Sequence, residues 1–314
     1  MVEASQIPVA ICIATYRRAE GLTRLLEGLG RLEFRGAPAP RVQVWVVDND
    51  PEGSASGVCE RMRAGLSWPL RYVAEPRRGV SYARNRAIAA LEPNVRFLAF
   101  LDDDEVPEPR WLDELLRVQA EYDADVVAGP VVPRFGSDAP AWVRNGRFFD
   151  LRRYPTGHLL DCADTGNVLV RTDVLGDTGL RFDETLALSG GEDTMLFLQV
   201  ARRGYRLVWA DAAVAHEWIP ETRTRAGWIL RRSFRQGNTW SLCERVLEPG
   251  LRVLGVRIAK GLGRIGLGIL LLPLSPFGGR AAVVRVLRQM SYGTGNLVGL
   301  AGVRYEEYRT SHGS

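Results

Sequence analysis

The chain has 314 residues, of which 46% are hydrophobic and 25% charged, so it can bury a substantial core and is neither disordered nor fibrous. Its four cysteines, Cys12, Cys59, Cys162 and Cys243, lack the spacing of a zinc site or a disulfide framework. The first residues show no basic segment followed by a long apolar one, so a secretory signal is not expected. These features predict a reduced, cytoplasmic protein.

The net charge of +4 is unevenly distributed along the chain. Residues 1–220 carry 26 Lys/Arg and 32 Asp/Glu, a balance of −6, whereas residues 221–314 carry 15 and 5, a balance of +10. The C-terminal part therefore favours an anionic neighbour. The acidic first part has no contiguous basic groove, so no nucleic acid is expected as a partner.

Short apolar runs alternate with helical patterns through the first 121 residues. The apolar runs fall at residues 8–14, 42–48, 70–75 and 95–102, and the helical patterns at about 20–32, 54–65, 80–91 and 109–121. This alternation predicts an α/β fold with a mainly parallel sheet that helices cover on both faces. Ligands of such sheets bind beyond the carboxyl ends of the strands. Polar residues follow all four runs, so one site is expected there.

The fourth run leads into four adjacent carboxylates, in the sequence FLDDDEVP at residues 100–107. Like charges at the end of a buried strand favour a divalent cation. The alternative is a helix N-terminus, where acidic residues interact favourably with the helix dipole, but this accounts for one or two carboxylates rather than four. Asp102 and Asp104 can point to the same side of an extended segment and bind Mg²⁺ or Mn²⁺, with Asp103 as the alternative ligand.

Six segments, in this order, resemble the family 2 glycosyltransferases that have the GT-A fold. They are ICIATYRR, VVDND, EPRRGVSYARNRAI, FLDDDEVPEPRWL, TGNVLVRTDVL and GGEDTMLFLQVARRGYRL. The similarity covers about residues 7–235 and points to the bacterial enzymes that extend polysaccharide repeat units, of the succinoglycan glucosyltransferase type. It implies a GT-A catalytic domain at residues 1–235 and a C-terminal helical extension at residues 236–314.

The resemblance implies a donor-nucleotide site. Its residues would be Thr15, Arg17, Asp48, Gly79, Arg84, Asn85, Asp102 and Asp103. Asp48 would accept a hydrogen bond from the uracil base, although turn chemistry is the alternative for this residue. Thr15 has a helix cap as its alternative. Asp50 departs from the family pattern, which usually has glycine at this position.

The resemblance also implies a metal site for Mn²⁺ or Mg²⁺. Asp102 and Asp104 would form its DxD pair, in agreement with the charge argument above. His216 is a secondary candidate ligand, because some GT-A enzymes bring a late histidine to the metal or the diphosphate. A packed or hydrogen-bonded role is the alternative for a single histidine.

The second half of the chain supplies the acceptor side. Two glycines precede Glu192 and Asp193 at a predicted helix start, where acidic residues are favourable, and paired glycines allow a ligand to approach the backbone. The resemblance implies that Asp193 is the general base, with Glu192 as its catalytic neighbour. The acceptor-binding residues would be Gly166, Asn167, Gly190 and Gly191.

These residues together predict an inverting, metal-dependent transfer of a single hexose from a nucleotide sugar, expected to be a UDP-hexose, to a saccharide. The QxxRW motif expected of a processive synthase is absent, which favours the addition of one sugar at a time. A nucleotidyltransferase should carry a GxGxR loop with a lysine after the first strand, which ATYRRAEG does not supply. A noncatalytic nucleotide-sugar-binding subunit would not need the Glu192-Asp193 pair.

Residues 250–303 are strongly apolar, but Arg264 and Pro273 interrupt them, and the uncharged stretch is shorter than the about 18–20 residues that span a bilayer. Flanking Lys and Arg residues suit an interfacial helix pair on an anionic inner leaflet. A buried helical hairpin is the alternative. We expect peripheral attachment to the inner face of the cytoplasmic membrane, since a lipid-linked saccharide is the expected acceptor. A basic helix with Arg231, Arg232 and Arg235 could contact a diphosphate or an acidic lipid.

Overall fold

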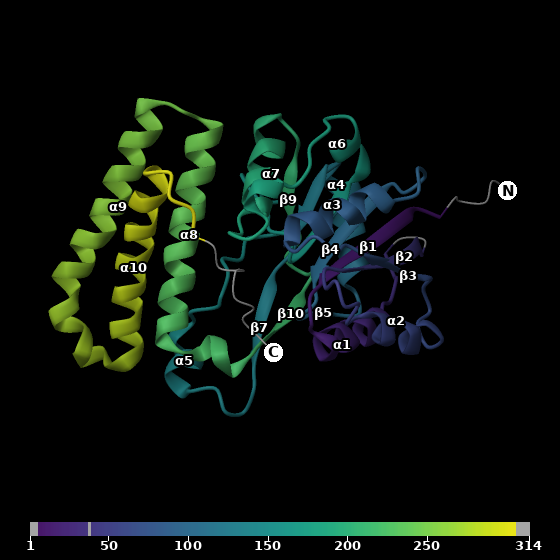
Figure 1. Ribbon diagram of the computed structural model, residues 1–314, viewed down its shortest axis with the longest axis horizontal. Coiled ribbons are helices and arrows are strands. Elements are labelled where there is room, and N and C mark those ends of the chain that lie inside the picture. Colours follow the sequence, from purple (N-terminus) through teal and green to yellow (C-terminus); the bar gives the residue numbers. More distant parts are fainter. Residues whose placement is uncertain (1–5, 37–38, 306–314) are drawn as a thin grey trace.

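The computed structural model describes residues 6–36 and 39–305, and Figure 1 shows two parts side by side: a sheet flanked by helices, and a bundle of three long helices. The central sheet has the strand order β3-β2-β1-β4-β8-β6-β9. Its strands are β1 (Pro8–Thr15), β2 (Arg41–Asp48), β3 (Leu70–Ala74), β4 (Phe97–Asp102), β6 (Val126–Ala128), β8 (Asn167–Arg171) and β9 (Leu207–Trp209).

The sheet is mainly parallel, which confirms the predicted fold class. Strand β1 pairs in parallel with β2 and β4, and β2 pairs in parallel with β3. Only β8 runs against its neighbours β4 and β6. In this register Thr15 lies beside Asp48, and Ala14 lies beside Asp102, so the polar strand ends meet at one edge.

Helices cover both faces of the sheet. They are α1 (Ala19–Leu29), α2 (Ser56–Arg63), α3 (Val80–Ala90), α4 (Trp111–Tyr122), α6 (Thr172–Gly176) and α7 (Glu192–Arg202). The short helix α5 (Ala141–Gly146) packs instead beside the C-terminal helices, with Val143 in one core with Trp228 and Val284. Alternate residues of β1 enter opposite cores: Ile11 packs in the core with Trp111 of α4, and Cys12 packs in the core with Phe197 of α7. The four predicted strands and the four predicted helices of residues 8–122 are all present.

A second, small sheet has the order β5-β10-β7. Its strands are β5 (Glu105–Pro107), β7 (Val131–Phe135) and β10 (Ala215–Ile219). Strand β10 runs antiparallel to β5, with Glu217 opposite Glu105. This pairing brings a segment more than a hundred residues later in the chain next to the aspartates that follow β4.

The bundle consists of α8 (Ala226–Leu247), α9 (Leu251–Leu271) and α10 (Gly279–Leu300), with the 3₁₀ segment η3 (Leu272–Gly278) joining the last two. The predicted domain boundary at residue 235 falls inside α8, which is one continuous helix. The helices α8 and α10 pack closely: a β-carbon at Gly237 would overlap the Tyr292 carbonyl, and one at Gly295 would overlap the Phe234 carbonyl. Glycine at these contacts lets the two backbones meet.

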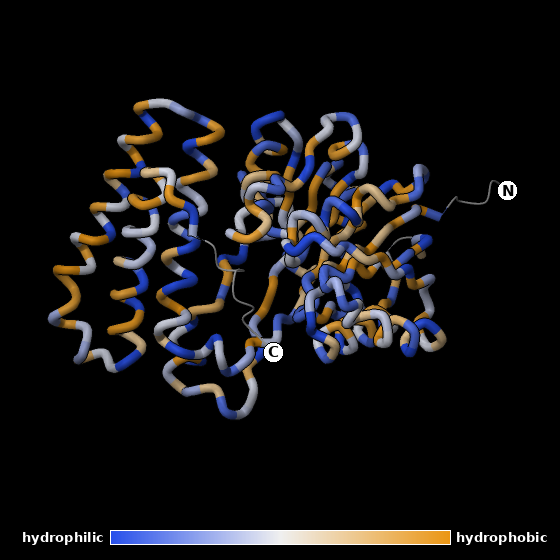
Figure 2. Tube along the Cα trace, in the orientation of Figure 1, coloured by the Kyte–Doolittle hydropathy of each residue, from blue (hydrophilic) through white to orange (hydrophobic). Residues whose placement is uncertain are grey.

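Helix α9 lies on the outside of the bundle and is rich in hydrophobic residues (Figure 2). Leu251, Leu262, Ile269 and Leu270 are among the exposed large hydrophobic residues. By length and composition, one span within the described residues, Leu251–Leu300, could cross a membrane. The mean hydropathy of its selected 18-residue window is 1.6, and 17% of that window is buried. The bundle therefore combines a tightly packed inner contact with an apolar outer face.

Candidate active site

The aspartates after β4 are held in a turn by arginine side chains. Arg18 Nη1 lies 2.8 Å from Asp103 Oδ1 and 2.9 Å from Asp104 Oδ2. The Thr15 hydroxyl donates a hydrogen bond of 2.8 Å to the other oxygen of Asp103. Burial raises the pKa of Asp103 to about 6, against the opposing charge of Arg18. The Arg18 guanidinium group thus lies between the carboxylates of Asp103 and Asp104.

Asp102 belongs to a second network that reaches the helix α7. Arg84 Nη2 lies 2.8 Å from Asp102 Oδ1, and Arg84 Nη1 donates to Glu192 Oε1. Glu192 Oε2 is buried without a hydrogen-bond partner within the described part of the chain. Burial raises the pKa of Glu192 to about 7, and the charge of Asp193 adds to this, whereas Arg84 opposes it. Arg84 therefore joins Asp102, on the predicted donor side, to Glu192, the neighbour of the predicted base Asp193.

A third arginine, Arg223, completes the pairing of Asp104. Its Nη1 atom lies 3.2 Å from Asp104 Oδ2 and 2.8 Å from Glu217 Oε1. Sequence reasoning gave Arg18, Arg223 and Glu217 no role. The motif ATYRR contains Arg18, but Arg223 and Glu217 follow no recognisable motif, and only the pairing of β10 with β5 places them here.

The fourth carboxylate of the run, Glu105, differs from the other three. It is buried and accepts a hydrogen bond of 3.0 Å from the Asp102 backbone N–H. Burial, followed by the charges of Asp102 and Asp104, raises the pKa of Glu105 well above its usual value. The raised pKa favours the neutral form of Glu105, and a neutral Glu105 adds no charge to the run.

The aspartates fit a divalent cation whose remaining ligands would be oxygen atoms of the substrate. No group of three or more His, Cys, Asp or Glu residues that could hold a metal ion is found within residues 6–36 and 39–305. Mg²⁺ is commonly held by one or two carboxylates together with substrate phosphates, so two carboxylates are sufficient. Asp103 and Asp104 already converge on one cationic group, and the Asp102 side chain is 43% exposed.

His216, the secondary candidate for the metal, does not contact the aspartates in this structure. Its Nε2 atom lies 2.9 Å from Glu108 Oε1, and Arg134 contacts both ring nitrogens. Successive residues of a strand point to opposite faces, and the next residue of β10, Glu217, is the one that faces Asp104. The hydrogen-bonded alternative for this histidine describes its position.

Asp193 lies in the first turn of α7 and is half-buried. Its Oδ1 atom accepts a hydrogen bond of 2.6 Å from the Thr194 backbone N–H, and within the described residues Oδ2 has no hydrogen bond. Asp164, to which the sequence reasoning gave no role, is exposed. The protein around the Asp164 carboxyl group raises its pKa to about 7 by removing hydration, and the charge of Asp193 contributes further.

The predicted uridine contacts are engaged within their own loop. Asp48 is fully buried, and its oxygens accept hydrogen bonds from the backbone N–H groups of Asp50 and Ala55 and from the Tyr72 hydroxyl. The structure thus places Asp48 in the turn chemistry that was its alternative. The unusual Asp50 pairs with Arg17 at 3.0 Å, so Arg17 is also directed to this loop.

The side-chain amides of two asparagines hold the segment after β3 in place through hydrogen bonds. Asn49 Oδ1 accepts a hydrogen bond of 2.7 Å from the Gly79 backbone N–H. The Asn85 side chain donates to the Phe182 carbonyl and accepts from the Phe182 N–H. Gly79 and Asn85 therefore position α3, and with it Arg84, against the segment before α7.

The four predicted acceptor-binding residues make close contacts within their own chain. A β-carbon at Gly166 would lie 2.5 Å from Glu105 Oε1, and one at Gly191 would overlap the Thr239 side chain of α8. Asn167 donates to the carbonyls of Pro130 and Ala213 and accepts from the Trp111 indole. Gly190 is buried with φ of 75°, a backbone conformation that favours glycine. The close approach expected of these glycines is to their own chain.

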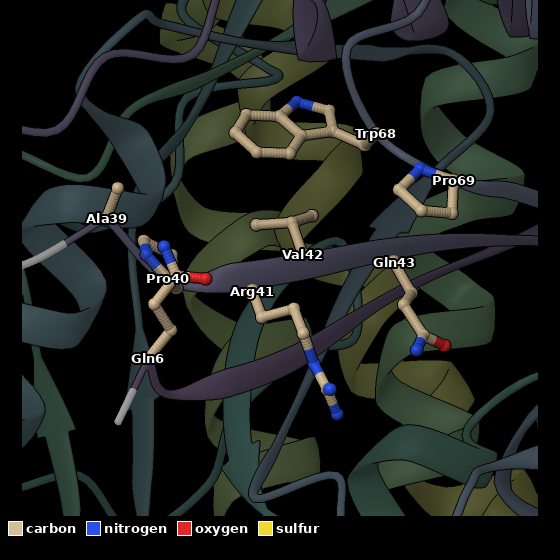
Figure 3. Close-up of a pocket in the computed structure, with 8 residues that line it drawn as sticks. All are labelled: Gln6, Ala39, Pro40, Arg41, Val42, Gln43, Trp68 and Pro69. Carbon is tan, nitrogen blue, oxygen red and sulfur yellow. The ribbon is translucent and has the colours of Figure 1, made fainter. Parts of the chain in front are cut away.

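A separate surface cavity of about 280 Å³ lies at the other end of the strands (Figure 3). Its lining includes Gln6, Arg41 and Trp68, which lie at or next to the starts of β1, β2 and β3. It is therefore distant from the carboxyl ends, where the aspartates converge, and we assign no role in the site to it.

Comparison with known proteins places this geometry among glycosyltransferases. A family model described as Glycosyl transferase family 2 matches residues 10–178. The Succinoglycan biosynthesis protein ExoM of Rhizobium meliloti is 36% identical over 251 residues, which cover 80% of this chain and 79% of that protein. Glycosyltransferase AglE of Haloferax volcanii is 26% identical over 230 residues, covering 73% and 71%.

Solved structures share the fold at low sequence identity. Mannosyltransferase PcManGT from Pyrobaculum calidifontis, in complex with GDP-Man and Mn²⁺, matches with a TM-score of 0.59 and 17% identity, covering 94% of this chain and 88% of that chain. S. aureus TarS 1-349 in complex with UDP matches with a TM-score of 0.52 and 17% identity, covering 95% and 93%. These structures are GT-A glycosyltransferases, and the similarity shows the same fold here.

Proposed function

The chain belongs to glycosyl transferase family 2 and is a glycosyltransferase, and we propose that it moves a single hexose from a UDP-sugar to a saccharide, with a divalent metal and with inversion at the anomeric carbon. The observation that carries this proposal is the bridge made by Arg84. One guanidinium group joins Asp102 of the aspartate turn to Glu192, the neighbour of Asp193. Donor and base chemistry can therefore act on one reacting centre.

Asp193 is the residue that we propose takes the proton. Its unbonded oxygen can accept the proton of an acceptor hydroxyl as that oxygen attacks the anomeric carbon. The new bond joins acceptor oxygen to carbon, the bond from carbon to the diphosphate oxygen breaks on the opposite face, and the electron pair leaves with the diphosphate. No enzyme nucleophile is needed, so one displacement inverts the centre.

The reaction also requires that the negative charge on the departing diphosphate be neutralised. A divalent cation at Asp104 and its neighbours would supply Lewis-acid neutralisation of that charge. Arg18 and Arg223, which now contact the aspartates, carry guanidinium groups that suit phosphate oxygens equally well. They are therefore available to bind the diphosphate when the carboxylates take another partner.

The nucleotide is tested by thermal shift of the full chain with UDP-, dTDP- and GDP-sugars, each with and without Mn²⁺. A ligand that binds only the folded state raises the apparent Tm by mass action. We expect the largest rise with a UDP-sugar and Mn²⁺ together. A rise in Tm with the GDP-sugar alone would show that the donor nucleotide is GDP and not UDP. Donor binding without transfer or hydrolysis would favour a noncatalytic binding subunit.

We also propose that the acceptor is lipid-linked and that the enzyme attaches peripherally to the inner membrane face. The exposed apolar face of α9 and the basic bundle support this, since such a face suits the boundary of an anionic bilayer.

The double variant Leu262→Glu/Ile269→Glu should lose binding to anionic vesicles. A matched control is Leu151→Glu/Leu159→Glu, which changes exposed leucines outside the bundle. Equal binding by both variants would contradict attachment through α9.

A further inference from the structure

The chain after α8 carries only positive charge as far as residue 304. Residues 249–304 contain eight Lys/Arg and no Asp/Glu. Four of these cations lie on α9, at Arg252, Arg257, Lys260 and Arg264. The next cation along the chain is Arg280, at the start of α10, so residues 265–279 carry no charge. We refer to residues 265–279 as the uncharged tip.

The uncharged tip exposes apolar side chains. Phe277 is 90% exposed and Leu270 is 71% exposed. The other exposed large hydrophobic residues of the tip are Leu267, Ile269, Leu271 and Leu274. The hydroxyl of Ser275, the one polar side chain of the tip, donates a hydrogen bond of 2.8 Å to the Leu272 carbonyl, and Ser275 is buried. The tip therefore suits an apolar environment better than water.

Each border of the uncharged tip carries an arginine that lies over an aromatic ring. The guanidinium carbon of Arg264 lies 4.0 Å from the centroid of the Tyr292 ring. The guanidinium carbon of Arg280 lies 4.6 Å from the centroid of the Trp142 ring. Aromatic rings are typical of the lipid headgroup level, and guanidinium groups suit phosphate oxygens. The borders of the tip therefore have the chemistry that fits an anionic bilayer surface.

The length of the tip limits how far it can enter a bilayer. Seven residues of α9 follow Arg264, and they correspond to about 10 Å of helix. An interfacial helix enters a bilayer by about 5–10 Å, whereas the hydrocarbon core is about 30 Å thick. The tip is therefore long enough for one leaflet, and the cations at both of its borders oppose deeper entry.

The uncharged tip lies at the end of the bundle that leads to the aspartate turn. Figure 1 shows the junction of α9 with α10 at the same end of the bundle as α5. Trp142 of α5, which Arg280 covers, packs against the core that contains Trp228 of α8. The guanidinium carbon of Arg223 lies 5.7 Å from the centroid of the Trp228 ring, and its Nη1 atom lies 3.2 Å from Asp104 Oδ2. Entry of the tip into a leaflet therefore places the bundle end next to the aspartate turn at the bilayer surface.

We propose that the uncharged tip inserts into one leaflet of an anionic bilayer, with Arg264 and Arg280 at the level of the lipid phosphates. This inference rests on the proposed membrane attachment, and it assigns that attachment to the tip instead of the whole length of α9. A second copy of this chain is the other occupant that an exposed apolar surface suits. Two copies would bring together segments that carry cations and no acid, which repel each other. Charge complementarity therefore favours the anionic bilayer.

Two double variants separate the tip from the rest of α9. Leu274→Glu/Phe277→Glu changes the tip, and Leu251→Glu/Leu254→Glu changes exposed leucines at the other end of α9. Cosedimentation measures binding of the full chain to vesicles of phosphatidylcholine and phosphatidylglycerol. The tip variant should lose about a hundredfold or more in affinity, since burial of one such side chain corresponds to roughly tenfold to a hundredfold, and the control should keep most of its affinity. Equal loss in both variants would overturn the proposal, and absence of wild-type binding would overturn membrane attachment itself.

A second measurement tests insertion independently of affinity. The variants Phe277→Cys and Leu251→Cys are each labelled with an environment-sensitive fluorophore, and labelled wild type gives the background from the native cysteines. On the same vesicles, lipids brominated in the acyl chains should quench the label at position 277 and leave the label at position 251 unquenched. Quenching at neither position would overturn insertion of the tip. A dimer in sedimentation velocity that Leu274→Glu/Phe277→Glu dissociates would assign the tip to a second copy and also overturn the proposal.

The border arginines are tested by the variant Arg264→Gln/Arg280→Gln. It should weaken binding to the anionic vesicles by about fivefold per cation, whereas Arg61→Gln/Arg63→Gln, on exposed positions of α2, should not. Unchanged binding in the first variant would overturn the placement of these arginines at the lipid phosphates. UDP binding by calorimetry should match the wild type in every variant of the tip, which separates failure of this inference from failure of the proposed transferase function.

Discussion

The aspartate turn and the helical bundle treat arginine in opposite ways. At the turn after β4, every aspartate contacts a guanidinium group: Asp103 and Asp104 contact Arg18, and Asp102 contacts Arg84. In the bundle, Arg285 and Arg288 form no ion pair with a carboxylate within the described residues, and Arg288 is nevertheless half-buried. The aspartate turn is thus paired within its own chain, whereas these two arginines of α10 have no carboxylate partner within the described residues.

This difference separates two kinds of binding site. A balanced pair binds a ligand by exchange: a metal replaces the arginine on the carboxylate, and the released arginine can contact the phosphate. A cation without a carboxylate partner can bind an anion by addition, because nothing has to leave. The following predictions test the exchange at the aspartate turn, from the largest expected effect to the smallest.

Asp193→Asn should have the largest effect on the reaction. The substitution keeps the shape of the side chain and removes its basicity, so transfer should fall by about 10²–10⁴-fold while donor binding changes little. Single-turnover transfer from a radiolabelled donor, with calorimetric donor binding alongside, measures both. Asp173→Asn, an exposed first-turn acid of α6, is the matched control. Near-normal transfer by Asp193→Asn would show that another residue is the general base.

Arg18→Met should tighten binding of Mn²⁺ alone. The wild-type guanidinium group lies within 3 Å of both Asp103 and Asp104 and competes with any cation there. Removing that competitor should raise Mn²⁺ affinity by about tenfold, the scale of one lost charge-assisted contact. Titration calorimetry without nucleotide measures this, and Arg24→Met on the exposed side of α1 is the control. Weaker Mn²⁺ binding by Arg18→Met would contradict the exchange.

Glu192→Gln should change how stability depends on pH. The folded-state pKa of Glu192 is about 7, above its ordinary value of 4.5, so the folded chain binds more protons than the unfolded chain between these values. Stability from this group is therefore complete at low pH and is lost as pH rises toward 7. The fall in wild-type Tm between pH 5 and pH 7.5 should be smaller in Glu192→Gln, with the exposed Glu60→Gln as control. An unchanged fall would contradict the raised pKa.

The sequence predicted the parts of the site that local pattern determines. Thr15, Asp48 and Asp102 follow apolar runs, and a parallel sheet must bring such strand ends together, as the register of β1 with β2 and β4 confirms. The turn geometry of the aspartates was not predictable in the same way. Asp103 and Asp104 share Arg18, whereas Asp102 pairs elsewhere, because the segment turns instead of remaining extended.

The residues that the sequence did not reveal depend on contacts between distant segments. Glu217 and Arg223 reach Asp104 only because β10 pairs with β5, and no local signal fixes that pairing. Gly166 and Gly191 mark close approaches, as their residue type indicates, and their neighbours in the chain are Glu105 and Thr239. A glycine shows that something must come near its backbone, and the fold alone shows what.

The central claim is that the aspartate turn binds the sugar nucleotide through a divalent metal. Calorimetric titration of UDP into the wild type and into Asp104→Ala, each with and without Mn²⁺, tests it most directly. Asp104 contacts two arginines and lies at the point where the carboxylates converge, so its loss should remove the metal-dependent part of the affinity. We predict tighter UDP binding with Mn²⁺ in the wild type and no effect of Mn²⁺ in Asp104→Ala. Equal UDP affinity of the wild type with and without Mn²⁺ would contradict the claim.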